Sequence, residues 1–204
     1  MVVLLEAVPA LSLCAINLLN TKFILYSAKM KITNDFLDKE DFEKIQNFFL
    51  SSDFPWYYND HINYPGEDIG GFKQFTHMLY NNLRPTSFAY DNLDPILSKI
   101  KPFAIARIKA NLVTKHTEVV EHGYHIDFTN APTGSLTSIL YLNDNDGYTK
   151  FKNGAKIESK ANRLVTFDGN MAHTGTTTTF DRRVVLNINW FPVGPPRTVE
   201  GQLL

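Results

Sequence analysis

The chain has 204 residues, of which 44% are hydrophobic and 20% are charged, so it can form one globular domain with a substantial core and is not a disordered chain. Its formal net charge of −1 gives no overall basic surface for phosphates, and no nucleic-acid partner is expected. The single cysteine, Cys14, excludes an intrachain disulfide and a thiolate zinc cluster, and it fits a reducing compartment; we expect a cytoplasmic protein.

Residues 1–29 form an apolar segment of uncertain role. Glu6 and Pro9 interrupt it, so a membrane span is not expected, and the absence of Lys or Arg before Lys22 does not fit a secretory signal. We favour a segment that packs on the domain or hangs loosely from it, with a weak targeting segment and a membrane span as alternatives. Met30 is an alternative natural start, because the sequence that begins there, MKITNDFLDKEDFEKIQNFF, is typical of the first segment of a folded domain.

The part from residue 30 to residue 101 is predicted to be helical. Apolar residues at helical spacing indicate a helix through residues 41–50, with Asn34 or Asp35 as its N-terminal cap. A second helix is predicted at residues 94–101, with Pro95 in its first turn. The other predicted elements are a short helix at residues 72–81 and an irregular loop at residues 56–71.

From Phe103 onward, short runs of β-forming residues alternate with turn residues. This pattern predicts a mainly β sandwich or jelly roll over residues 103–191, within a single domain that spans residues 30–204. The predicted strands are residues 104–112, 124–128, 136–142, 149–151, 163–167 and 183–191.

A candidate metal site begins in the sequence HIDF. On a strand, His125 and Asp127 would point to the same face, and His173, which follows a predicted strand and turn, could supply a third ligand. Two neutral imidazoles and one carboxylate form the facial triad of non-heme Fe(II) oxygenases, with positions left open for a co-substrate and O₂. Zinc would also bind this set of ligands.

A pair of arginines precedes the last apolar strand, VVLNINWF. A guanidinium can bind a carboxylate through two hydrogen bonds, which suits the distal end of a dicarboxylate. Alternation along the strand places Arg183 on the polar face with Asn187 and Asn189, and Arg182 on the apolar face. We therefore choose Arg183 as the carboxylate ligand, although a β-bulge would reverse the choice.

Together, HID at residues 125–127, His173, RVVLNINWF at residues 183–191 and SILYLNDNDGYTKF resemble the prolyl-4-hydroxylase-like group of 2-oxoglutarate/Fe(II)-dependent dioxygenases. The resemblance implies a double-stranded β-helix (jelly roll) with N-terminal flanking helices. It implies that His125, Asp127 and His173 hold Fe(II), and that Arg183 and the Tyr141 hydroxyl bind the distal carboxylate of 2-oxoglutarate. Ascorbate is a further candidate cofactor. The sequence departs from the family where Gly147 alone precedes the Thr-x-Phe motif, since members often have two glycines.

The activity implied by this resemblance is hydroxylation of a C–H bond, in a peptidyl proline or a small molecule, with conversion of 2-oxoglutarate and O₂ to succinate and CO₂. Two alternatives are a non-catalytic, cupin-like metal-binding jelly roll and a zinc hydrolase. Arg183 and Tyr141 argue against the first, because a structural metal site needs no dicarboxylate clamp. The second lacks an obvious general base, since Glu118 and Glu121 lie in an upstream loop. The substrate and the oligomeric state stay open.

Overall fold

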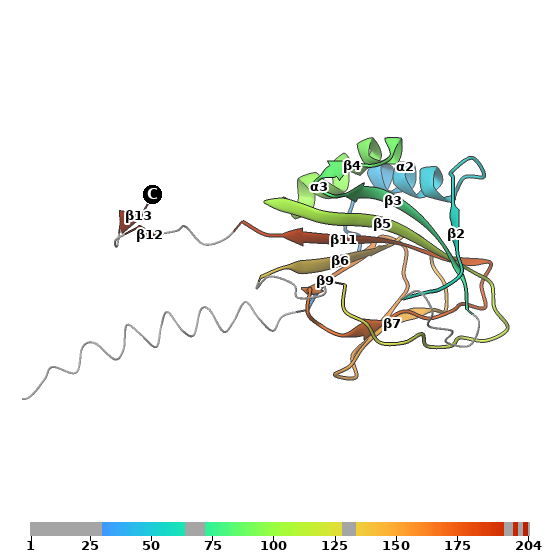
Figure 1. The fold of residues 1–204 in the computed structure, drawn as a ribbon. Coiled ribbons are helices and arrows are strands. Elements are labelled where there is room, and N and C mark those ends of the chain that lie inside the picture. Colours follow the sequence, from blue (N-terminus) through green and yellow to red (C-terminus); the bar gives the residue numbers. More distant parts are fainter. Residues whose placement is uncertain (1–29, 64–71, 128–133, 194–197, 200–201, 204) are drawn as a thin grey trace, which may run out of the picture.

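A computed structural model describes residues 30–63, 72–127, 134–193, 198–199 and 202–203 (Figure 1). The predictions for residues 1–29 lie outside this part of the chain. In chain order the elements are β1 (Lys31–Thr33), α2 (Lys39–Leu50), β2 (Tyr57–Asn59), β3 (Gln74–Asn81), β4 (Arg84–Pro85), the 3-10 helix η1 (Phe88–Leu93), α3 (Asp94–Ile100), β5 (Ala104–Thr114), β6 (Leu136–Tyr141), β7 (Tyr148–Phe151), β8 (Lys156–Glu158), β9 (Arg163–Asp168), β10 (His173–Thr174), β11 (Arg182–Phe191), β12 (Thr198–Val199) and β13 (Gln202–Leu203).

The strands form a jelly roll, as the sequence predicts. The large antiparallel sheet has the order β1-β9-β6-β11-β5-β3-β2, with β4 paired to β3, and a smaller sheet has the order β10-β7-β8. Figure 1 shows α2 and α3 on one side of the large sheet and β7 on the opposite side. The large sheet is therefore the middle layer, with helices outside it and the small sheet facing its inner surface.

Strand β11 shows how the sequence produces these layers. Its even-numbered residues Val184, Leu186 and Ile188 are buried in the core that the large sheet shares with the helices. Its odd-numbered residues face the small sheet, and Val185 belongs to a second core with residues of β6 and β7. Because side chains alternate along a strand, one strand contributes to both layers. The predicted assignment of the β11 faces is confirmed.

Helix α2 confirms the helix predicted at residues 41–50. It buries Phe42, Ile45 and Phe49 against the large sheet, and each buried side chain contributes roughly 1.5–3 kcal/mol. The predicted N-terminal cap is wrong, because the helix begins after Asp38. The side chain of Asn34 is used elsewhere, since its Oδ1 accepts a hydrogen bond of 2.7 Å from Arg163 Nε.

The helix predicted at residues 72–81 is wrong. Residues 74–81 form β3, which pairs with β5 in the register Phe75↔Leu112 and His77↔Ala110. The edge of β5 supplies backbone partners along this segment, and tertiary pairing outweighs the local pattern. The loop predicted at residues 56–71 likewise contains β2, and β1 to β4 make the segment from residue 30 to residue 101 only partly helical.

The strands predicted after residue 103 are confirmed as β5, β6, β7, β9 and β11, with bounds that differ by one or two residues. The strand predicted at residues 124–128 is wrong within the described residues. His125 instead forms an isolated antiparallel bridge with His173, and Asp127 follows in a bend. The single bridge is enough to place the two histidines side by side.

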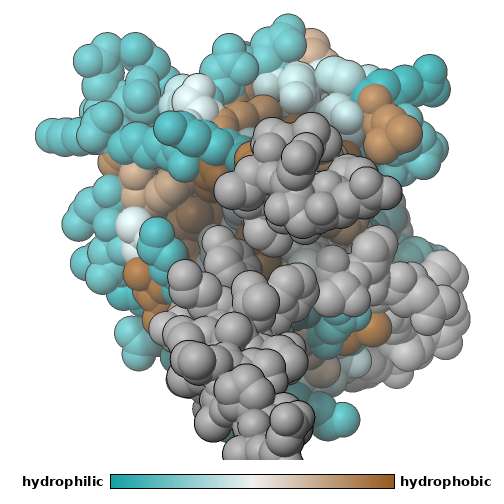
Figure 2. All heavy atoms as spheres, turned by 90° about the vertical axis from the view of Figure 1, so that its left-hand side faces the viewer, coloured by the Kyte–Doolittle hydropathy of each residue, from teal (hydrophilic) through white to brown (hydrophobic). Residues whose placement is uncertain are grey.

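Figure 2 views the molecule from the left-hand side of Figure 1, where β5 begins and β11 ends. Hydrophobic patches lie between hydrophilic side chains on this face. Phe103 and Val193, which flank these strand ends, are 75% and 70% exposed. Among the residues that the structure describes, no helix has the length and apolar character needed to cross a membrane.

Candidate metal centre

A polar cavity of about 370 Å³ lies between the two sheets. Its lining combines the odd-numbered residues of β5 and β11 with the segment that carries the HID sequence. Among the described residues, the polar groups that line it are Asn63, Gln74, Arg107, Lys109, Asn111, His122, His125, Asp127, Thr149, His173, Arg183 and Asn187.

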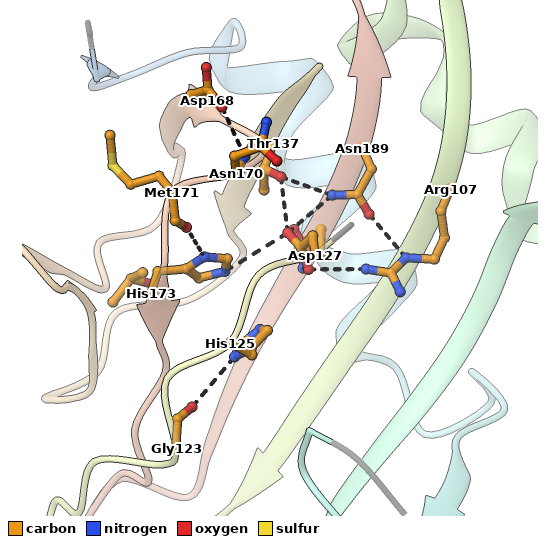
Figure 3. A network of polar contacts seen from close by, with 12 residues as sticks. Arg107, Gly123, His125, Asp127, Thr137, Asp168, Asn170, Met171, His173 and Asn189 are labelled. Atoms are coloured by element: carbon orange, nitrogen blue, oxygen red, sulfur yellow. Dashed lines mark hydrogen bonds and ion pairs between the residues drawn. The ribbon is translucent and has the colours of Figure 1, made fainter. Parts of the chain in front are cut away.

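The three predicted metal ligands meet at one end of this cavity. One ligand atom of each of His125, Asp127 and His173 lies within 4.8 Å of the others. Two backbone hydrogen bonds of 2.9 and 3.0 Å join His125 to His173, and His173 Nε2 lies 3.8 Å from Asp127 Oδ2. Figure 3 shows the side chains of Asp127 and His173 pointing toward each other, with His125 nearby. The structure thus brings the predicted triad together.

Backbone carbonyls orient both imidazoles. His173 Nδ1 lies 3.0 Å from the carbonyl oxygen of Met171, which can only accept, so Nδ1 donates this hydrogen bond and Nε2 faces Asp127. His125 Nδ1 lies 3.5 Å from the Gly123 carbonyl oxygen. Burial, together with the neighbouring His173, lowers the pKa of His125 to about 4. His125 is therefore neutral at physiological pH, as a metal ligand must be.

The carboxylate of Asp127 is enclosed by hydrogen-bond donors. Oδ1 accepts from Arg107 at 3.0 Å and from Asn187 at 3.3 Å, whereas Oδ2 accepts from Thr137 at 3.0 Å and from Asn189 at 3.1 Å. Burial alone would raise the pKa of this carboxyl, but His173, Arg107 and His125 hold it below its usual value. The side chain is 2% exposed, so Asp127 is a buried and ionised carboxylate with a fixed orientation.

This set of donors fits Fe(II). Two oriented imidazoles and one ionised carboxylate are the facial triad of non-heme iron oxygenases, and all three residues line the cavity, where a co-substrate could bind. The same ligands accept zinc. The donor set therefore fits a divalent transition metal.

Arg183 lies at another part of the same cavity and is 6% exposed. Its Nε donates to Ser159 Oγ at 3.0 Å, and one terminal nitrogen lies 3.3 Å from Thr149 Oγ1 and 3.4 Å from the Tyr148 carbonyl. None of the described carboxylates forms an ion pair with it. A guanidinium stays charged in proteins, so Arg183 is a buried cation that has no counter-ion within the described part of the chain. Arg182 does not line the cavity.

Gly147 allows the chain to pass close to Arg183. A Cβ atom at this position would lie 2.7 Å from Arg183 Cδ and 2.9 Å from Thr176 Oγ1, which real side chains do not tolerate. The glycine of the DGYTKF sequence therefore packs directly on the arginine. This contact gives a physical reason for a glycine here.

Tyr141 is fully buried and lies behind the cavity lining. Its hydroxyl donates a hydrogen bond of 2.7 Å to Thr149 Oγ1, and Thr149 in turn lines the cavity beside Arg183. The Tyr141 ring lies 5.7 Å from the Arg183 guanidinium carbon. Tyr141 is thus positioned to act through Thr149, a residue that the sequence analysis did not select. The roles of Arg183 and Tyr141 toward 2-oxoglutarate stay predictions.

Sequence reasoning also missed the charged residues of β5. Arg107, Lys109 and Asn111 alternate with Ile108 and Ala110 in the sequence ARIKANL. The alternation rule that selected Arg183 on the last strand would have placed these polar residues on the cavity face too. The alternation of polar and apolar residues was therefore a usable signal, since all three polar residues line the cavity.

No protein-family model matches the sequence, and a search of the curated proteins finds no relative. Solved structures do match. A prolyl-4-hydroxylase from Pseudomonas putida has 12% identity and a TM-score of 0.58, and the match covers 82% of this chain and 95% of that one. A prolyl hydroxylase from Trichoplax adhaerens, in complex with a hypoxia inducible factor peptide fragment, has 15% identity and a TM-score of 0.58 and covers 91% and 94%.

A third match is the epimerase SnoN in complex with Fe3+, alpha ketoglutarate and nogalamycin RO. It has 12% identity and a TM-score of 0.56, and the match covers 94% of this chain and 96% of that one. The chain therefore has the fold of the prolyl hydroxylases and related 2-oxoglutarate/Fe(II) oxygenases, which confirms the predicted double-stranded β-helix. At these identities the likeness concerns the fold, and function has to be argued from the site.

Proposed function

We propose that this protein is an Fe(II)- and 2-oxoglutarate-dependent dioxygenase that hydroxylates a substrate C–H bond. One observation carries the proposal: a single cavity holds both the His125–Asp127–His173 triad and Arg183, a buried cation that forms no ion pair with any described residue. A metal site alone would not need Arg183, and an anion site alone would not need the triad. A dicarboxylate that chelates a metal at one end uses both.

In this proposal, His125, Asp127 and His173 would hold Fe(II). Bound Fe(II) would supply the O₂ chemistry that oxidises 2-oxoglutarate to succinate and CO₂ and the substrate to its alcohol. Arg107, Thr137 and Asn189 keep the Asp127 carboxylate in one orientation. Because the ligand is already oriented, metal binding requires little rearrangement.

Arg183 would bind the distal carboxylate of 2-oxoglutarate. The hydroxyl of Thr149 lies 3.3 Å from the guanidinium, so both can donate to the same anion. The Tyr141 hydroxyl donates to Thr149 Oγ1, which leaves the Thr149 proton available for the co-substrate. Val113, Val185 and Ile139 add apolar surface to the lining of the same cavity.

The zinc hydrolase is the weaker candidate. A hydrolase needs a general base within reach of the metal-bound water. Glu121 is instead bound to Lys150 at 2.8 Å and to the Tyr148 hydroxyl at 2.9 Å, and Glu118 is exposed. Neither glutamate lines the cavity. The cupin-like alternative leaves the buried charge of Arg183 unexplained.

Both proposed substrate classes, a peptidyl proline and a small molecule, have a precedent among proteins of this fold. The hydroxylase from Trichoplax adhaerens is in complex with a peptide, whereas SnoN is in complex with nogalamycin RO. The substrate class of this chain therefore has to be argued from its own cavity residues.

The test is an anaerobic titration of the Fe(II)-loaded protein with 2-oxoglutarate, followed by visible absorption. We expect a weak, saturable metal-to-ligand charge-transfer band that disappears in Asp127→Ala, with Asp91→Ala as the matched control because Asp91 is exposed and distant from the triad in sequence. Absence of a band in the wild type, together with tight zinc binding, would favour the hydrolase or the structural alternative.

A further inference from the structure

The cavity contains a second cation that has no partner among the described residues, Lys109. It lies on the inner face of β5, opposite Asn187 of β11, and its side chain lines the cavity. Among the described residues, its ammonium group makes no hydrogen bond and no ion pair. The nearby Arg107 differs, because it donates to both Asp127 and Asn189.

The position of Lys109 is unfavourable for a free ammonium group. Burial and the neighbouring Arg107 lower the pKa of Lys109 to about 8, although Asp127 acts in the opposite direction. At neutral pH the group is still mainly charged. A charge kept in such a place without a partner costs stability, which is typical of residues that serve a ligand.

The charge balance of the cavity points to what this ligand carries. The described lining contains three cationic side chains, Arg107, Lys109 and Arg183, and one carboxylate, Asp127, which leaves two net positive charges. Fe(II) and doubly charged 2-oxoglutarate together add none. With both bound, the cavity would still favour a further anion.

Two polar groups near Lys109 are also unsatisfied. The side-chain oxygens of Asn111 and Asn187 are buried and accept no hydrogen bond from the residues that the structure describes. Asn111 lies two residues along β5 on the same face, and Asn187 is the cross-strand neighbour of Lys109. Asn187 donates to Asp127, so this subsite is directly adjacent to the proposed iron site.

We propose that Lys109 binds a carboxylate of the substrate, so the substrate is a carboxylic acid whose reacting carbon lies close to its acid group. This inference rests on the proposed dioxygenase function and names its substrate class. Lys109 pairs with the acid group, and the free oxygens of Asn111 and Asn187 accept hydrogen bonds from N–H or O–H groups nearby on the same molecule. Arg183 remains occupied by 2-oxoglutarate.

Lys109 could instead bind the 1-carboxylate of 2-oxoglutarate itself. The two assignments predict different results when Lys109 is changed. If Lys109 serves the substrate, Lys109→Met leaves the affinity for 2-oxoglutarate within about twofold of wild type and removes a separate anion site. If Lys109 serves the co-substrate, the same change weakens 2-oxoglutarate binding.

The experiment uses anaerobic protein loaded with Fe(II) and saturated with 2-oxoglutarate, and trifluoroacetate is the probe. Its ¹⁹F signal, broadened by the nearby paramagnetic iron, reports binding without turnover. We expect saturable binding in the wild type and in Lys152→Met, an exposed lysine outside the cavity, and binding at least about tenfold weaker in Lys109→Met and Lys109→Gln.

The charge-transfer titration on the same samples separates a failure of the substrate inference from a failure of the dioxygenase proposal. A band in the wild type with no saturable trifluoroacetate binding, or with equal binding in the Lys109 variants, overturns the substrate inference and leaves the dioxygenase proposal standing. Weakened 2-oxoglutarate binding in Lys109→Met also overturns it. No band in the wild type contradicts the dioxygenase proposal itself.

Discussion

The two ends of the cavity are built in opposite ways. At the triad, the protein balances the charge of Asp127, since the carboxylate has four hydrogen-bond donors and one of them, Arg107, also forms an ion pair with it. At the other end, Arg183 is buried with neutral partners, and the nearby His122 has a buried Nε2 without a hydrogen bond. The Asp127 carboxylate is fully hydrogen-bonded before a ligand arrives, whereas the described residues leave the charge of Arg183 unbalanced.

This difference indicates what each end binds. A metal ion needs ligands that are already deprotonated and oriented, which is what the donors around Asp127 and the carbonyl at His173 provide. An anion needs an uncompensated donor, which is what Arg183 provides. We therefore expect changes at the triad to affect the metal, and changes near Arg183 to affect the co-substrate.

The largest effect is expected for Asp127→Asn. The amide keeps the size of the carboxylate but removes its charge, and we expect Fe(II) affinity to fall by more than about 100-fold, since even changes outside the ligand set cost about 10- to 100-fold. Competition with a chromophoric chelator measures this affinity. Asp91→Asn is the control, and near wild-type affinity in Asp127→Asn would remove Asp127 from the site.

Arg183→Met is expected to weaken 2-oxoglutarate binding by about 10- to 100-fold, because charge-assisted hydrogen bonds to a carboxylate are lost. Metal affinity should not change, since Arg183 makes no contact with the triad. Calorimetric titration of the metal-free protein with zinc, and then of the zinc-loaded protein with 2-oxoglutarate, measures the two affinities. Arg182→Met is the matched control on the same strand, and an equal effect of the two changes would contradict the assignment.

Arg107→Met should weaken Fe(II) binding by about tenfold, because Asp127 keeps Thr137 and Asn189 as donors but loses its ion pair. Arg107 acts as a positioning residue, so Arg107→Lys should restore part of the metal affinity. The chelator assay checks both variants, with the exposed Arg84→Met as control. A change in 2-oxoglutarate affinity at saturating metal would contradict the assignment of Arg107 to the metal site alone.

The smallest effect concerns His122 and pH. Burial, then Arg183, lowers the pKa of His122 to about 4 from its ordinary value of 6.5. The unfolded chain therefore takes up this proton first, so the stability of metal-free protein falls as pH decreases from about 6.5 to about 4. Urea unfolding across this range should show a shallower fall for His122→Leu. An identical pH dependence would show that His122 does not contribute.

The sequence predicted the strands of the jelly roll well, because β5, β6, β9 and β11 combine alternating patterns with clear turn residues. It failed at residues 72–81, where the pairing of β3 with β5 decides the structure and is invisible to a local pattern. The strand predicted at residues 124–128 is wrong within its described part, residues 124–127, yet the triad forms, because one bridge between His125 and His173 replaces the strand.

The sequence predicts the metal ligands of the candidate site but not the residues that surround them. His125, Asp127 and His173 have a recognisable chemistry and order in the chain, whereas the donors around Asp127 come from three separate strands. Such convergence follows from sheet order and register, which short sequence motifs do not encode. The alternating polar residues of β5 were the one signal that could have revealed Arg107 and Lys109.

The central claim is that one dicarboxylate spans the triad and Arg183. The most direct test compares 2-oxoglutarate with 2-oxobutyrate, which lacks the distal carboxylate, in wild type and in Arg183→Met loaded with zinc. We predict that 2-oxoglutarate binds at least about tenfold more tightly than 2-oxobutyrate in the wild type, and that this preference largely disappears in Arg183→Met. A preference that survives the loss of Arg183 would contradict the account.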